Sequence, residues 1–176
     1  LLGKVLISGG GRCNVTHACF DPNELVENYP RGFREFLGPF NKFGCGDTME
    51  WFTDRGVELK IENDNRVFPV SNESSTIVNC LLDFAKRAGV EFHLRHGLKS
   101  IIKENDLFSL HFDSGDIFSF DRVLIATGGS KRLWSELKKL GHQVVTPVPS
   151  LFTFNIRDSR LNDMAGISMP QVRATV

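Results

Sequence analysis

The heptapeptide SGGGRCN at residues 8–14, hereafter the glycine loop, combines residue types that could bind an anionic or electron-rich ligand. It contains three consecutive glycines, Gly9, Gly10 and Gly11. Glycine lets the backbone approach a ligand closely, and successive N–H groups can converge on an anion. Arg12 adds a positive charge, and Asn14 adds an amide that can donate or accept a hydrogen bond. The alternative is a tight structural loop in which Arg12 pairs with an acidic side chain.

Two further side chains, Cys13 and Arg66, could take part in ligand binding or catalysis. Cys13 follows Arg12, and a neighbouring guanidinium favours the reactive thiolate form of a cysteine. The nearest cysteine in sequence is Cys19, and we favour a packing role for Cys13 over a catalytic one. Arg66 begins an apolar run that stops at a proline, so it could face a site, although a surface arginine is equally ordinary there. Apart from His93-x-x-His96 the histidines show no metal-ligand spacing, and no metal site is predicted.

A second glycine-containing segment follows the continuous apolar run at residues 122–126. Its residues are Ala126, Thr127, Gly128 and Gly129. A continuous apolar strand is typical of a parallel sheet that is covered on both faces, and α/β sheets bind ligands at the carboxyl ends of such strands. The alternative is a simple turn between a strand and a helix. The chain contains neither G-x-x-x-x-G-K-[ST] nor G-x-G-x-x-G, so these glycines alone do not define a self-contained nucleotide site.

The elements that must position these segments alternate between helix and strand, which predicts an α/β fold. Helices are predicted to start at Asp21-Pro22 and to cover residues 47–55, 74–88 and 131–140. Strands are predicted at residues 57–61, 66–70, 90–94, 98–103, 107–112, 117–120, 122–126, 143–146 and 171–176. The three strands between residues 98 and 120 are joined by short turns, which favours a small antiparallel β-meander. Two prolines at residues 147 and 149 indicate a domain boundary at residues 147–150.

Composition excludes several classes of protein. The chain has 21 basic and 21 acidic residues, so it lacks the basic excess expected of a nucleic-acid-binding protein. No apolar run approaches the ~20 residues of a membrane helix, and the first residues do not form a signal peptide. The four cysteines form no CxxC pair, which favours reduced thiols and a cytoplasmic location.

Four motifs together resemble one known family. SGGGRCNVT at residues 8–16, RVFPVS at 66–71, DRVLIATGG at 121–129 and LGH at 140–142 are similar to the HI0933-like flavoproteins, also described as BaiN-like or aminoacetone-oxidase-like FAD-dependent oxidoreductases. The resemblance implies that a Rossmann-type domain holds FAD in an extended form, with the glycine loop near its pyrophosphate and flavin. It also implies that the strand around residues 97–99 offers backbone to the adenine, and that the turn at residues 126–129 lies beside the cofactor.

The resemblance implies a set of cofactor-binding residues. They are Ser8, Gly9, Gly10, Gly11, Arg12, Cys13, Asn14, Arg66, Leu98, Ala126, Thr127, Gly128 and Gly129. The expected function is that of part of a flavoprotein oxidoreductase, which binds FAD and passes electrons between a small-molecule substrate and an acceptor, with NAD(P)H as a candidate donor. In such a protein the flavin carries the chemistry, and no side chain is assigned a catalytic role.

The sequence departs from the family pattern in ways that define the expected domains. Relatives begin with a strand, a GxGxxG turn and a strand that ends in an acidic residue, whereas this chain opens on LLGK. Residues 1–147 are therefore expected to form an incomplete FAD/NAD(P)-binding domain without the first β-α-β unit, and residues 148–176 to start a second, β-rich domain. Self-association through an exposed sheet edge is also expected.

Two alternatives to a flavin-dependent enzyme remain open. The first is a degenerate, non-catalytic flavoprotein module that binds a partner or a nucleotide weakly. The second is an α/β protein whose glycine loop binds another phosphate-containing ligand, although the missing P-loop lysine counts against nucleoside triphosphates.

Overall fold

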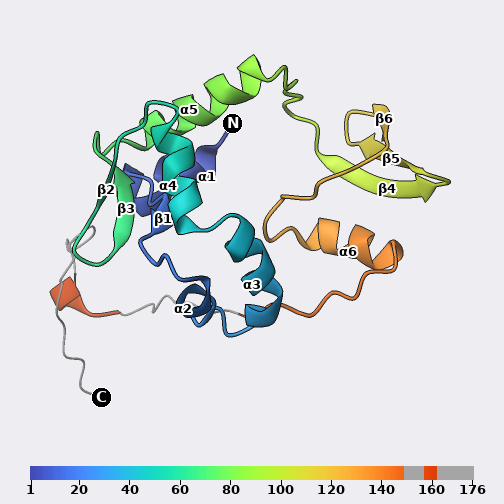
Figure 1. Cartoon of the computed structure of the whole chain (residues 1–176). Coiled ribbons are helices and arrows are strands. Elements are labelled where there is room, and N and C mark those ends of the chain that lie inside the picture. The colour runs from blue at the N-terminus through green and yellow to red at the C-terminus, as the bar shows by residue number, and fades with distance from the viewer. Residues whose placement is uncertain (149–156, 162–176) are drawn as a thin grey trace. The chain divides into compact units, whose positions relative to one another are not determined.

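The computed structural model describes residues 1–148 and 157–161 of the chain (Figure 1). Its contacts divide the chain into two compact units, Leu1–His96 and Gly97–Val176. The boundary expected at residues 147–150 adjoins residues outside the described ranges, and it stays a prediction. The strand predicted at residues 171–176 also lies outside the described residues.

The first unit is a small antiparallel sheet with helices around it. Its elements are α1 (Gly3–Ile7), the 3₁₀ turn η1 (Ser8–Gly11), β1 (Thr16–His17), α2 (Pro22–Val26), α3 (Phe33–Lys42), α4 (Cys45–Thr53), β2 (Leu59–Ile61), β3 (Arg66–Pro69) and α5 (Ser74–Arg87). The strand order is β1-β3-β2, and both pairings are antiparallel. The register places Thr16 opposite Val67 and Lys60 opposite Phe68. β3 is therefore the central strand, directly after the turn that carries Glu62.

Local signals in the sequence account for the ends of two helices. The Asp21 side chain caps α2 by accepting a hydrogen bond from the Asn23 backbone N–H at 2.8 Å, and Pro22 occupies the first helical position. α5 ends before Gly89, whose φ of +74° is the left-handed conformation that closes many helices. Both helices therefore begin or end where the sequence predicts.

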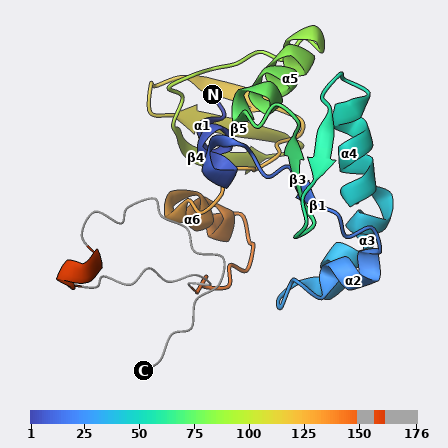
Figure 2. The same ribbon diagram turned by 90° about the vertical axis from the view of Figure 1, so that its left-hand side faces the viewer.

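The core of the first unit lies between α4, α5 and the sheet. Four buried side chains contact one another there: Cys13, Phe52, Val57 and Ile77. Val67 and Phe68 on the central strand are completely buried. Figures 1 and 2 both show α4 running beside the sheet and α1 lying against α5. The Ser74 hydroxyl fixes α1 to α5 by donating to the Leu6 carbonyl at 2.7 Å.

The second unit is an antiparallel meander with one helix packed on it. Its elements are β4 (Leu98–Glu104), β5 (Leu107–Phe112), β6 (Ile117–Phe120), α6 (Lys131–Lys139) and the 3₁₀ turn η2 (Ser159–Leu161). Ile101, Leu110 and Leu133 form its core. A bidentate ion pair also ties the helix to the meander, because Arg132 donates to both carboxylate oxygens of Asp113 at 2.9 and 2.7 Å. The meander therefore forms as the sequence predicts.

The predicted parallel sheet is wrong for the part of the chain that the structure describes. Every strand pairing there is antiparallel, and the segments 90–94, 122–126 and 143–146 form no strand. A strand exists only where a neighbour supplies ladder hydrogen bonds, and these apolar segments have no such neighbour among residues 1–148 and 157–161. Val123 and Ile125 pack instead against the core of the second unit, while Leu124 between them is 91% exposed.

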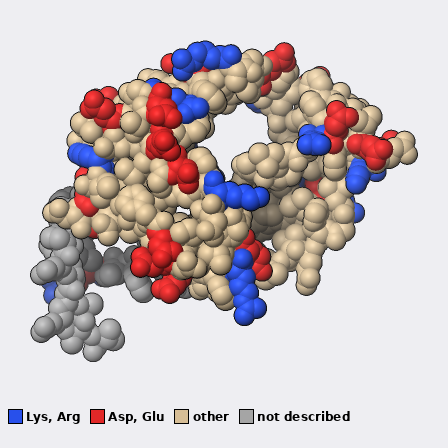
Figure 3. Space-filling model, viewed as in Figure 1, with Lys and Arg blue, Asp and Glu red and all other residues tan. Residues whose placement is uncertain are grey.

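The surface in view in Figure 3 carries both signs of charge, as the equal numbers of acidic and basic residues in the sequence lead one to expect. Figure 3 shows basic and acidic side chains interspersed over the face in view. None of the helices in the described ranges combines the length and the hydropathy that crossing a membrane requires. In those same ranges no three His, Cys, Asp or Glu side chains gather as a group that could hold a metal ion.

Candidate functional site

The glycine loop follows α1 directly and turns in a left-handed conformation. Gly9, Gly10 and Gly11 have φ values of +56°, +68° and +84°. The turn is closed by backbone hydrogen bonds, in which the Cys13 N–H donates to the Ser8 carbonyl at 3.0 Å and the Arg12 N–H to the Gly9 carbonyl at 3.4 Å. L-residues with side chains rarely adopt such φ values, so this conformation accounts for the run of glycines.

The glycines of the loop differ in what surrounds them. A Cβ on Gly9 would lie 2.7 Å from the Asn14 nitrogen and 3.0 Å from Cε1 of Phe68, so the loop backbone is pressed against the neighbouring chain at that point. A Cβ on Gly10 or Gly11 would meet no atom within 4 Å. Packing therefore requires a bare Cα at Gly9, whereas Gly10 and Gly11 leave an open face of backbone that a ligand could approach.

Arg12 is fixed by partners from the β2–β3 hairpin. Its Nη1 lies 2.6 Å from Oε1 of Glu62, and its guanidinium carbon lies 4.0 Å from the centroid of the Phe68 ring. Glu62 is thus the acidic partner expected if the glycine loop is a structural loop in which Arg12 forms an ion pair. The Arg12 side chain is still 34% exposed, so the charge is held in place without being enclosed.

Arg66 lies close to the same two residues. Its Nη2 is 3.9 Å from Oε2 of Glu62, its Nε is 2.6 Å from Oδ2 of Asp64, and its guanidinium carbon is 5.4 Å from the Phe68 centroid. The hydrogen bonds from Arg66 hold the pKa of Asp64 below its usual range. The structure therefore brings together two arginines predicted to bind cofactor, Arg12 and Arg66, around Glu62 and Phe68.

Glu62 and Phe68 were not predicted as site residues. Fifty positions separate Glu62 from Arg12, and no local pattern links them. The available signal was the RVFPVS motif, which contains Phe68 and follows the turn that carries Glu62.

The remaining residues of the glycine loop have structural partners. Cys13 is buried in the core of the first unit, which favours the packing role. The Ser8 hydroxyl donates to the Val5 carbonyl at 2.8 Å. With its amide nitrogen facing the two carbonyls, Asn14 donates to Val67 at 3.2 Å and to Thr16 at 2.9 Å. These three side chains shape the loop, whereas the backbone of Gly10 and Gly11 is exposed and the Arg12 guanidinium is partly exposed.

Two other cysteines are unsuited to act as nucleophiles. Burial is the main cause that raises the pKa of the Cys19 thiol, and the nearby Glu24 carboxylate raises it further. Burial also raises the pKa of the Cys80 thiol, against the opposing effect of Arg55 and Arg87. Both therefore stay protonated at neutral pH, where the thiolate would be the reactive form.

A cavity of about 480 Å³, hereafter the β1 cavity, lies beside the glycine loop. Its polar walls are Asn14, Thr16, His17 and Thr48, with the Gly44 backbone. Its other walls are Val15, Leu25, Tyr29, Phe40, Phe43 and Cys45. The cavity thus forms where β1, α2, α3 and α4 meet, and Asn14 belongs both to it and to the loop.

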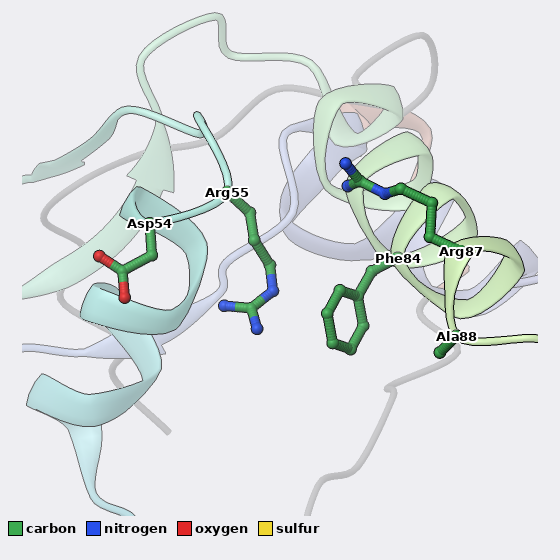
Figure 4. A pocket seen from close by; sticks show the side chains of 5 residues that line it. All are labelled: Asp54, Arg55, Phe84, Arg87 and Ala88. Carbon is green, nitrogen blue, oxygen red and sulfur yellow. The ribbon is translucent and has the colours of Figure 1, made fainter.

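A second depression, of about 610 Å³, lies between α4 and α5 and contains two arginines (Figure 4). Arg55 is held there between two aromatic rings, with its guanidinium carbon 3.9 Å from the Trp51 centroid and 4.3 Å from that of Phe84. Figure 4 shows the Arg55 and Arg87 side chains pointing in different directions, so their charges do not converge on one ligand position. We interpret Arg55 as a cation–π clamp between the two helices.

The other predicted cofactor-binding residues belong to the second unit. Leu98 begins β4 and pairs with Phe112. The segment from Ala126 to Gly129 leads into α6, and Gly128 has a φ of +64° there. Ser130 then caps α6 by accepting a hydrogen bond from the Leu133 N–H at 3.4 Å. Cofactor binding stays a prediction for these residues, which are Leu98, Ala126, Thr127, Gly128 and Gly129.

Comparison with known proteins identifies the class of domain. The family model described as "HI0933-like protein Rossmann domain" matches residues 1–174. The chain therefore belongs to the HI0933-like family, as the motifs of the glycine loop and of β3 indicate.

Curated relatives are identical to this chain at about a quarter of the aligned positions. A 3-dehydro-bile acid delta(4,6)-reductase of Clostridium scindens is 27% identical over 172 residues, which cover 93% of this chain and 41% of the relative. A ribosomal RNA dihydrouridine synthase of Escherichia coli is 25% identical over 180 residues, and the one of Haemophilus influenzae is 24% identical over 181. Those alignments cover 96% and 95% of this chain and 44% of each relative. The chain thus spans less than half the length of these relatives.

Proposed function

We propose that this chain supplies part of the FAD-binding surface of a flavin-dependent oxidoreductase. The observation that carries the proposal is the accessible backbone at Gly10 and Gly11, whose positive φ favours glycine and where a Cβ would meet no atom within 4 Å, so that a ligand can reach the backbone there. Membership of the HI0933-like family supports the same assignment. The loop residues fit a dinucleotide, since they offer backbone N–H groups and one guanidinium to its phosphates.

In this proposal each part of the first unit has a distinct task. The backbone of Gly10 and Gly11 lies along the cofactor, and Arg12 supplies a positive charge that Glu62 and Phe68 keep in one position. Bound FAD would supply electron transfer, while the protein residues bind it, orient it and exclude water. The fixed position of Arg12 lowers the entropy lost when an anion binds, because the side chain is already ordered.

We also propose cofactor contacts for residues of the second unit. Leu98 would offer backbone to the adenine, and the segment from Ala126 to Gly129 would lie beside the cofactor. We also propose that a domain boundary lies between residues 147 and 148. We expect the chain to self-associate in solution through an exposed sheet edge.

We further propose that the substrate is a small molecule and that NAD(P)H is the electron donor. The relatives include a 3-dehydro-bile acid delta(4,6)-reductase and a ribosomal RNA dihydrouridine synthase. The equal numbers of acidic and basic residues in this chain favour a small molecule over RNA.

The test is the visible absorbance of the purified chain after FAD is added and free FAD is removed by gel filtration. A flavin band that elutes with the protein supports the proposal, and anaerobic bleaching of that band by NADH or NADPH supports the donor. A colourless protein would favour the non-catalytic alternative.

A further inference from the structure

The β1 cavity adjoins the glycine loop at Asn14, which belongs to both. A substrate in the cavity would therefore lie next to the loop that we propose to contact the cofactor. This inference rests on the proposed function. The volume of the β1 cavity, about 480 Å³, is in the range of sites that hold small organic molecules.

The lining of the β1 cavity contains no carboxylate, ammonium or guanidinium side chain. None of its lining residues is Asp, Glu, Lys or Arg. Tyr29, Phe40 and Phe43 provide three aromatic walls. A charged group inside would lose part of its hydration and would find no Asp, Glu, Lys or Arg in return, whereas a flat apolar ring would contact aromatic faces.

Two polar groups of the cavity wall, the Tyr29 hydroxyl and the His17 ring, could orient such a ring by hydrogen bonding. The Thr48 hydroxyl already donates to the Gly44 carbonyl at 2.9 Å, and the Asn14 amide is occupied by two carbonyls. In the described part of the chain, no hydrogen bond is found for the Tyr29 hydroxyl or the His17 ring. These two groups are therefore available to a carbonyl or hydroxyl on the ligand.

We propose that the β1 cavity binds the uncharged ring system of the substrate, and that any charged group of the substrate stays outside it. The chemical class is a planar, uncharged molecule of two or three fused rings with a hydrogen-bond acceptor at its edge. Tyr29 and His17 are its polar contacts, and the aromatic side chains of α3 and of its C-terminal end cover its face.

The test compares two probes of the same shape and different charge. Isothermal titration calorimetry and saturation-transfer NMR measure the binding of coumarin and of coumarin-3-carboxylate to the full chain. We expect coumarin to bind at least about tenfold more tightly, because the carboxylate would lose part of its hydration without gaining a basic partner from Lys or Arg. Thr48→Lys places a cation in the cavity wall, and we expect it to reverse this preference.

The chain offers a matched control on the same helix. Thr53 also lies on α4, and its hydroxyl donates to the Met49 carbonyl at 2.9 Å as that of Thr48 does to Gly44, but Thr53 is exposed and lies outside the cavity. Thr53→Lys should leave the preference for coumarin unchanged, and circular dichroism confirms that both variants are folded.

The outcomes separate this inference from the proposed function. A chain that retains FAD but binds both probes equally, or neither at millimolar concentration, overturns the cavity assignment alone. Equal effects of Thr48→Lys and Thr53→Lys overturn it as well. A chain that shows the charge preference but retains no FAD contradicts the proposed function, and the cavity then cannot be a substrate site of that reaction.

Discussion

Alanine substitutions at three glycines separate the structural and ligand-facing parts of the glycine loop. Gly9, Gly10 and Gly56 all have positive φ, at +56°, +68° and +80°, so Ala is strained at each. Only at Gly9 would the new Cβ also collide with backbone, 2.7 Å from the Asn14 nitrogen. At Gly10 and Gly56 it would meet nothing within 4 Å.

The magnitudes follow from these differences. A left-handed Ala costs about 1–2 kcal/mol, of which about 0.4–1 kcal/mol is offset because Ala restricts the unfolded chain. Gly10→Ala and Gly56→Ala should therefore each lower the free energy of unfolding by about 1 kcal/mol. Gly9→Ala should lower it by a further 1–3 kcal/mol or so, because the Asn14 backbone and the Phe68 ring must shift to admit the methyl group.

Urea denaturation followed by Trp51 fluorescence measures these changes within the first unit. Trp134→Phe removes the other tryptophan, which belongs to the second unit, so that the signal reports on the first. If Gly9→Ala proved no more destabilising than Gly10→Ala, the close contact of the loop with Asn14 would be refuted. An equal loss at Gly56 and Gly10 is the expected control result.

Three further predictions concern charged side chains. Arg12→Ala should lower stability by about 1–2 kcal/mol in urea denaturation, because the ion pair with Glu62 and the ring contact are lost, and an unchanged midpoint would contradict this. Hydrogen bonding to Lys139 is the main cause that holds the pKa of the buried Glu136 below its usual value of 4.5. The stabilisation by ionised Glu136 is therefore complete above pH 4.5, and it is lost as the pH falls through the lower folded pKa. Glu136→Gln cannot lose a proton. Acid titration by circular dichroism should therefore show that the folded signal falls less steeply with decreasing pH for Glu136→Gln than for the wild type. Arg55→Ala should cost about 1–2 kcal/mol and shift the Trp51 emission, with Arg55→Lys intermediate, and identical spectra would rule out the clamp.

Hairpins and one long helix were predictable because their signals are local. β5 and β6 were predicted with the bounds that the structure gives, since the turn at residues 113–116 fixes where each strand stops. α5 was predicted to within one residue from its apolar spacing and the glycine that follows it. Both kinds of element are encoded within a few neighbouring positions.

Elements that depend on distant partners were missed or wrong. α3 contains Pro39 and was not predicted, but ring contacts stabilise it: Phe36 stacks on Phe40 with ring centroids 5.5 Å apart, and the Tyr29 ring lies tilted against Phe36 with centroids 4.8 Å apart. The apolar run at 122–126 reads as a strand, yet no described strand pairs with it. Within the site, the glycine loop was recognisable from its residues, whereas the pairing of Arg12 with Glu62 depends on the folding of a hairpin fifty positions away.

The most direct test of the central claim is the affinity for FAD of the Gly10→Ala and Gly56→Ala chains. The two substitutions impose the same kind of backbone strain, and only Gly10 lies on the face proposed to contact the cofactor. Quenching of flavin fluorescence on binding gives the dissociation constants. We predict that the wild type and Gly56→Ala bind FAD alike and that Gly10→Ala binds at least about tenfold more weakly, a difference of about 1.4 kcal/mol. Equal affinities of the two variants, or no binding by the wild type, would contradict the claim that the glycine loop holds the cofactor.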